Sequence, residues 1–99
     1  MTAKIVIETR QERLAKIEPA IQRLREMIPP LQAEIRRAKI RLLSVSEEAA
    51  EERAIKRIYR ARRKLECIWW DIAPLQVERD RCKKEIEDAR REIGGATWV

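Results

Sequence analysis

Residues 14–45 have the sequence LAKIEPAIQRLREMIPPLQAEIRRAKIRLLSV, in which an apolar side chain recurs every three or four residues. With Leu14 at position a of a heptad, every a and d position over five heptads is apolar. These positions are Leu14, Ile17, Ile21, Leu24, Ile28, Leu31, Ile35, Ala38, Leu42 and Val45. Such a repeat is typical of a coiled-coil seam, so it predicts a long amphipathic helix.

A second heptad repeat follows the sequence Ser44-Val-Ser-Glu47, which has the S-x-x-E form of a helix-starting capping box. Its a and d positions are Ala54, Ile58, Ala61, Leu65, Ile68, Ile72, Leu75, Arg79, Cys82, Ile86, Ala89 and Ile93. Only Arg79 among them is polar. Because a short turn separates the two seams, they predict an all-α fold, an elongated antiparallel helical hairpin or coiled coil.

The ends of the hairpin are indicated by a Thr9-x-x-Glu12 capping box and by Gly94-Gly95, since glycine is common just past a helix C-terminus. These signals predict an N-terminal extension at 1–8, a hairpin at 9–93 with helices over about 10–43 and 46–93, and a flexible C-terminal tail at 94–99. The apolar run Ile5–Ile7 is compatible with an edge strand or with a lead-in segment that packs near the helix start.

Four prolines, Pro19, Pro29, Pro30 and Pro74, lie outside both seams. A proline removes one backbone hydrogen bond and disfavours helical geometry in the residue before it. We therefore expect the hairpin to bend at its prolines, most sharply at Pro29-Pro30. The alternative is that this pair turns a corner, which would give a bundle of three or four shorter helices.

The second predicted helix is longer than the first, and this suggests an unpaired end. If the first helix starts near Thr9, the second has no partner helix beyond about residue 80. The apolar residues Cys82, Ile86, Ala89 and Ile93 would then be bare. We expect a homo-oligomer or a hetero-complex to cover them, completing a bundle.

Composition argues against catalysis and against export. The chain of 99 residues has no histidine, which is the commonest general base and metal ligand, so we expect no enzyme activity, cofactor or metal site. Cys67 and Cys82 lie on one predicted helix roughly 22 Å apart, too far for a disulfide. Reduced thiols and the lack of a long apolar run favour a cytoplasmic protein without membrane contact.

Positive charge is concentrated in the segment 36–64, which has eleven basic and four acidic residues, whereas the whole chain has a net charge of +6. This segment surrounds the predicted turn, and a basic tip favours a polyanionic partner, foremost nucleic acid of either type. The candidate nucleic-acid-binding residues are Arg36, Arg37, Lys39, Arg53, Lys56, Arg57, Tyr59, Arg60, Arg63 and Lys64. The alternatives are an acidic protein surface as the partner, or a basic face that is merely solvated.

Trp69 lies at an e position beside the second seam, and Trp70 lies at an f position that faces away from it. Both extend an apolar strip that includes Ile55. Either a bent first helix covers them, or they form an interface with another chain. We favour the interface, because a two-helix hairpin has little mass with which to cover a second strip. The candidate protein-interface residues are Ile55, Trp69, Trp70, Cys82, Ile86, Ala89 and Ile93.

These patterns together predict a small non-catalytic adaptor. Its basic tip would contact nucleic acid, and its tryptophan and overhang surface would contact protein. The second hypothesis is an inhibitor or assembly subunit that docks on an acidic protein surface, for example within a larger nucleoprotein machine.

Overall fold

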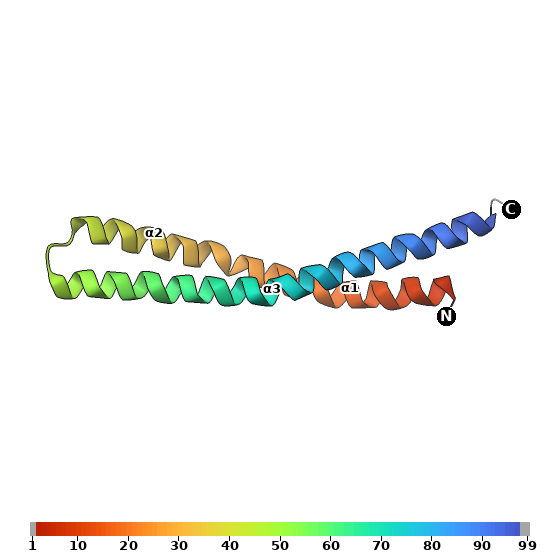
Figure 1. The fold of residues 1–99 in the computed structure, drawn as a ribbon, viewed down its shortest axis with the longest axis horizontal. Helices are drawn as coiled ribbons and strands as arrows, with labels where there is room; N and C mark the ends of the chain where they lie inside the picture. The colour runs from red at the N-terminus through yellow and green to blue at the C-terminus, as the bar shows by residue number, and fades with distance from the viewer. Residues whose placement is uncertain (1, 98–99) are drawn as a thin grey trace. The chain divides into compact units, whose positions relative to one another are not determined.

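The computed structural model describes residues 2–97 and contains three helices in this range. They are α1 (Ala3–Glu26), α2 (Ile28–Ser44) and α3 (Glu48–Thr97) (Figure 1). No strand occurs between residues 2 and 97, which confirms the prediction of an all-α helical hairpin. None of these helices combines the length and the apolar character needed to cross a membrane.

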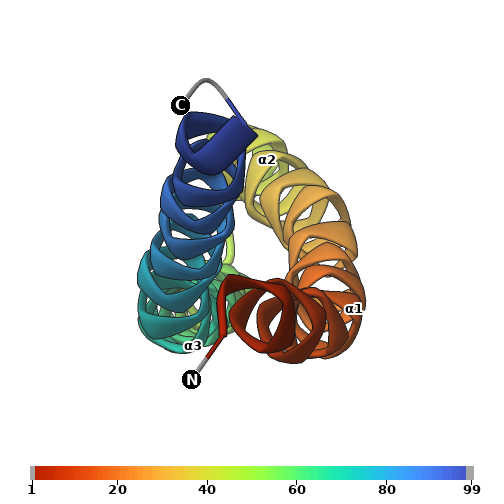
Figure 2. The ribbon, with the colours of Figure 1, turned by 90° about the vertical axis from the view of Figure 1, so that its right-hand side faces the viewer.

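The helices form two compact units, which we describe separately. The terminal unit contains α1 up to Gln22 and α3 from Ala73 onward. Within it the two helices run antiparallel, and in Figure 2 the start of α1 and the end of α3 lie at the same end of the unit. In agreement with this, Arg10 pairs with Glu85, and Arg13, further along α1, pairs with Glu78. The loop unit consists of Arg23–Ile72 and includes the connection between α2 and α3.

Each unit has its own apolar core, and both cores consist of predicted seam residues. In the terminal unit, Ile17, Ile21 and Cys82 are buried, with Leu14 and Leu75 packed against them. In the loop unit the cluster is formed by Ile28, Ile68 and Ile72 with Leu24, Leu31 and Leu65 packed against it. The two predicted heptad frames are therefore confirmed.

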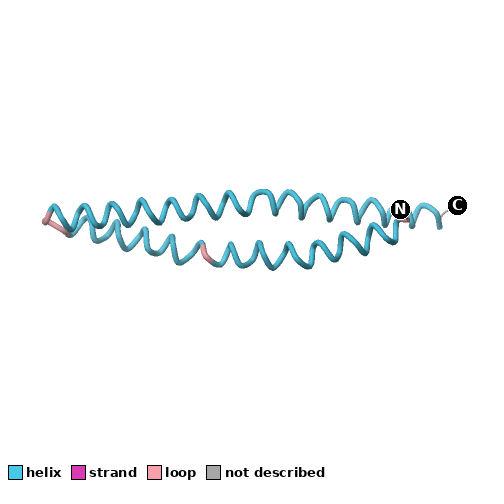
Figure 3. Tube along the Cα trace, turned by 90° about the horizontal axis from the view of Figure 1, so that it is seen from below, coloured by secondary structure: helices cyan, strands magenta, loops and turns pink. Residues whose placement is uncertain are grey.

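Within the loop unit, the Pro29-Pro30 pair interrupts the helix without ending the apolar seam. Only Met27 lies between α1 and α2, and its N–H donates to the Leu24 carbonyl at 3.1 Å (Figure 3). Both prolines lie in the first turn of α2, where backbone N–H groups have no helical partner in any case. Because Leu24 and Leu31, on either side of the break, pack against one cluster, the seam continues through it.

The N-terminal extension is helical, and the capping box predicted at Thr9 does not form. The cap is Thr2 instead, whose hydroxyl oxygen accepts a hydrogen bond from the Ile5 N–H at 3.4 Å. The Thr9 hydroxyl donates to the Ile5 carbonyl at 2.8 Å, as in a helix interior. The apolar run at the N-terminus thus extends α1 rather than forming an edge strand.

The connection between α2 and α3 consists of residues 45–47. The Ser44 hydroxyl donates to the Arg41 carbonyl at 3.1 Å, so this residue closes α2 rather than capping the next helix. Glu48 and Glu51 lie in the first turn of α3, where their charge favours a helix N-terminus. The predicted start of the second helix is close to the observed one, but its cap differs.

The predicted bare stripe at the end of the second helix is wrong for Cys82, Ile86 and Ala89, which are all buried within the chain. The reason is the early start of α1 together with the register of the pair. Arg10 lies level with Glu85, so α1 lies alongside α3 beyond residue 80, which was the predicted limit of the paired region. Of the predicted stripe only Ile93, which is 44% exposed, lacks cover within the described residues.

Gly94 and Gly95 do not end the helix, since α3 continues to Thr97. The predicted flexible tail therefore begins as helix, and Trp98 and Val99 lie outside the described residues. A Cβ atom added to Gly94 would have no neighbour within 4 Å. We expect Gly94→Ala to raise the free energy of unfolding by about 0.5–1 kcal/mol, because glycine disfavours a helix interior by about that amount. Urea denaturation followed by circular dichroism measures the change, and a loss of stability would contradict it.

Candidate functional site

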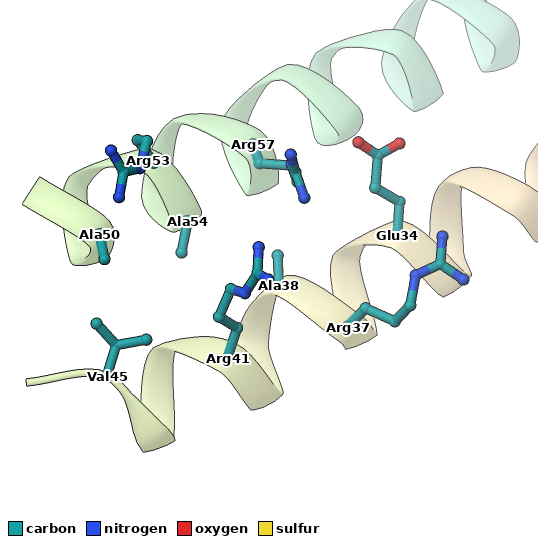
Figure 4. Close-up of a pocket in the computed structure, with 9 residues that line it drawn as sticks. All are labelled: Glu34, Arg37, Ala38, Arg41, Val45, Ala50, Arg53, Ala54 and Arg57. Carbon is teal, nitrogen blue, oxygen red and sulfur yellow. The ribbon is translucent and has the colours of Figure 1, made fainter.

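A groove between α2 and α3 lies in the loop unit, close to the connection, and has a volume of about 630 Å³ (Figure 4). Its lining residues are Glu34, Arg37, Ala38, Arg41, Val45, Ala50, Arg53, Ala54 and Arg57. Ala38 and Ala54 are both only 4% exposed and form the floor. The groove therefore has a small apolar base and a rim of arginines.

The heptad pattern explains this construction. Ala38 and Ala54 occupy d positions, where small side chains leave room at the seam. Arg41 and Arg57 occupy g positions, which flank the seam on one side of the hairpin. Their side chains extend into the space between α2 and α3 in Figure 4. Two helices thus contribute cations to a single concave surface.

The arginines of the groove have no ion-pair partner within 4 Å among residues 2–97. These arginines are Arg37, Arg41, Arg53 and Arg57, and Glu34 lies at the edge of the groove. The loop unit contains thirteen basic and eight acidic residues, a net charge of +5, compared with +1 for the terminal unit. Unpaired like charges in one groove favour an anionic ligand.

The terminal unit shows the opposite arrangement, because its charges pair across the helices. The Arg13 guanidinium donates two hydrogen bonds to the Glu78 carboxylate, from Nε to Oε1 at 2.5 Å and from Nη2 to Oε2 at 3.0 Å. The Lys83 Nζ atom lies 3.8 Å from the Glu18 Oε1 atom. The hydrogen bond from Arg13 holds the pKa of the Glu78 carboxyl below its usual value. These basic residues already have partners within the chain, unlike those of the groove.

A second basic feature lies further along α3. Tyr59, Arg60, Arg63 and Lys64 line a shallow depression on this helix, and the Tyr59 side chain is 65% exposed. A row of cations connects this depression to the groove, because residues three and four apart share a helix face. The row consists of Arg53, Arg57, Arg60 and Lys64.

The structure brings together most of the predicted nucleic-acid-binding residues, in two places. Arg37, Arg53 and Arg57 line the groove. The residues that line the depression are Tyr59, Arg60, Arg63 and Lys64. The other three, Arg36, Lys39 and Lys56, are exposed but line neither feature.

Arg41 and Glu34 line the groove but were missing from the predicted set. Both occupy g positions of the first heptad frame, as Arg57 does in the second frame. In an antiparallel pair the g positions of the two helices lie on the same side of the seam, and this signal was available in the sequence.

The tryptophans are not part of the core. Trp69 is 52% exposed and Trp70 is 78% exposed, and Ile55 is half exposed on the same helix. The alternative in which a bent first helix covers them is therefore wrong. We name Ile55, Trp69 and Trp70 the tryptophan surface.

The two cysteines are free thiols, Cys67 exposed and Cys82 buried. No cluster of three or more potential metal-ligating side chains occurs in the described part of the chain. Comparison of the chain with protein-family models, with curated proteins and with solved structures gave no match.

Proposed function

We propose that the protein is a small non-catalytic binding protein whose loop unit contacts the phosphate backbone of a nucleic acid. The observation that carries this proposal is the groove between α2 and α3, whose lining includes four arginines without an ion-pair partner among the described residues. Guanidinium groups bind phosphates through paired hydrogen bonds, and arginine is less strongly hydrated than lysine. An arginine-lined groove therefore suits a phosphodiester chain.

The proposal includes a second contact, between the tryptophan surface and a protein. Exposed tryptophans are typical of residues that dominate the binding energy of interfaces. The exposed tryptophans are equally compatible with the second candidate, an inhibitor or assembly subunit that binds an acidic protein surface, because that candidate also needs a protein interface. The two candidates differ in what the groove binds, so direct binding to nucleic acid separates them.

The first test is fluorescence polarisation of labelled DNA and RNA, single- and double-stranded, titrated with the protein at about 50, 100 and 200 mM salt. We expect micromolar or tighter binding at the lowest salt, with an affinity that falls steeply as salt rises because bound counterions are released. If no nucleic acid binds at about 50 mM salt, the proposal is wrong, and an acidic protein partner becomes the candidate for pull-down experiments.

The same experiment includes a variant that places an acid in the groove. Ala50 lines the groove, while Ala49 is an exposed neighbour that does not. We expect Ala50→Glu to weaken binding about tenfold or more, because the new carboxylate competes with phosphate for the arginines. Ala49→Glu is the matched control: it has the same charge in the same helix turn, and it should change affinity by no more than about twofold. Equal losses in both variants would show that the groove is not the contact.

A further inference from the structure

The nucleic acid that this protein binds can be specified further from the geometry of α3, on the premise of the proposed function. Arg53, Arg57, Arg60 and Lys64 follow one another at alternating spacings of four and three residues. With a rise of 1.5 Å per residue, these cations form a row roughly 16 Å long on one helix face. The row begins in the groove and ends in the depression that contains Tyr59.

Tyr59 is the only aromatic residue that lines either basic feature, and it lies beside three cations. Tyr59 is 65% exposed, and the residues that share its depression are Arg60, Arg63 and Lys64. An exposed aromatic ring next to a cationic track is the arrangement by which proteins hold unpaired bases, since any base can stack on it while its phosphates are neutralised. In a duplex the base faces are stacked on each other and are not available to such a ring.

The groove is also poorly suited to reading a duplex. It lies between two packed helices, each about 10–12 Å in diameter with its side chains. The major groove of DNA is about 12 Å wide and admits a single helix. Two helices side by side are too wide to enter it together, so a groove that lies between them meets the phosphates of a duplex rather than its base edges. A single strand can follow the arginine row and still offer its bases to Tyr59.

We infer that the ligand is a single-stranded polynucleotide whose backbone follows the row from Arg53 to Lys64 and whose base stacks on Tyr59. Stacking on one aromatic ring does not depend on base identity, so the binding has little sequence preference. The phosphate contacts are common to DNA and RNA, and the test has an arm for each.

The experiment compares single strands of about 20 nucleotides, oligo-dT and oligo-U, with a duplex of the same length at equal salt, using Tyr59→Leu, Tyr59→Phe and the unaltered protein. We expect single strands of at least one type to bind about tenfold more tightly than the duplex. Tyr59→Leu should weaken single-strand binding about tenfold and leave duplex binding within about twofold, whereas Tyr59→Phe should retain single-strand binding. Val77→Ala is the control for loss of an exposed apolar side chain on the same helix, and it should not change the affinity.

Two results would overturn the inference. One is a duplex bound as tightly as either single strand, and the other is an equal loss of duplex and single-strand affinity in Tyr59→Leu. In both cases nucleic acid still binds, so the proposed function survives. If neither single strand nor duplex binds at low salt, the inference and the proposed function are both wrong. The experiment therefore distinguishes failure of the single-strand inference alone from failure of the proposed function.

Discussion

Ile72→Ala is expected to lower the free energy of unfolding of the loop unit by about 3 kcal/mol, within the range of about 2–5 kcal/mol for truncating a buried isoleucine. Ile72 is 0% exposed and packs with Ile28 and Ile68 in the loop-unit cluster. A hairpin of two helices has few layers of neighbours that can collapse into the cavity. Helices in water depend mainly on packing of this kind, so the loss is large relative to the few kcal/mol that stabilise a small domain.

Urea denaturation followed by far-UV circular dichroism measures this change, and Trp70→Ala is the control. Trp70 is larger than Ile72 and lies two residues before it on α3, but its side chain is 78% exposed. We expect its removal to change stability by no more than about 0.5 kcal/mol. If Trp70→Ala were the more destabilising change, and more so at high protein concentration, the fold would depend on association between copies.

The core could be predicted from the sequence because the heptad repeat is long and almost uninterrupted. Leu24, Ile28 and Leu31 keep their seam positions even across Pro29-Pro30. A break in the helical hydrogen-bond pattern at Met27, whose backbone keeps helical dihedral angles (φ −78°, ψ −17°), is enough to accommodate both prolines. The apolar contacts on either side hold the two helices on the same seam. Packing within the loop unit, and not proline chemistry alone, therefore decides that the seam continues past the two prolines.

The ends and the register of the helices were harder to predict. Thr9-x-x-Glu12 has the form of a capping box, but Thr2 also caps a helix, and the apolar run between them becomes part of α1. In that helix Val6 and Ile7 are partly buried, whereas Ile5 is exposed. A heptad repeat fixes which face of each helix is apolar, but not how far one helix is shifted along the other. The observed register places Arg10 beside Glu85, and this shift buries Cys82 and Ile86.

The candidate nucleic-acid site could likewise be predicted from the sequence only in part. Charge counting located the basic segment, but the side of the seam on which each cation lies depends on pairing two heptad frames. Lys39 and Arg41 are two residues apart and equally basic, yet only Arg41 lines the groove. The tryptophan surface was correctly expected to be exposed, because a two-helix hairpin has no third element to cover it.

Arg41 has a nearby lysine, Lys39, and Arg57 has one in Lys56, so two double variants with the same net charge can be compared. Arg41→Gln/Arg57→Gln and Lys39→Gln/Lys56→Gln each remove two positive charges from the same turns of the same helices. Only the first pair lines the groove. We expect the arginine variant to lose about 30-fold or more in affinity for single-stranded nucleic acid, because two charge-assisted contacts to phosphate are lost.

The dependence of affinity on salt gives a second measure of the same effect. Each phosphate contact to a single strand contributes about 0.7 to the slope of log affinity against log salt, so the arginine variant should lose about 1.4 of that slope. The lysine variant should keep most of the slope, because its charges lie on other faces and are screened beyond about 10 Å at moderate salt. If both variants lose affinity and slope equally, binding follows the total charge of the loop unit and not the groove. A loss confined to the arginine variant would identify the groove as the place where the phosphates bind.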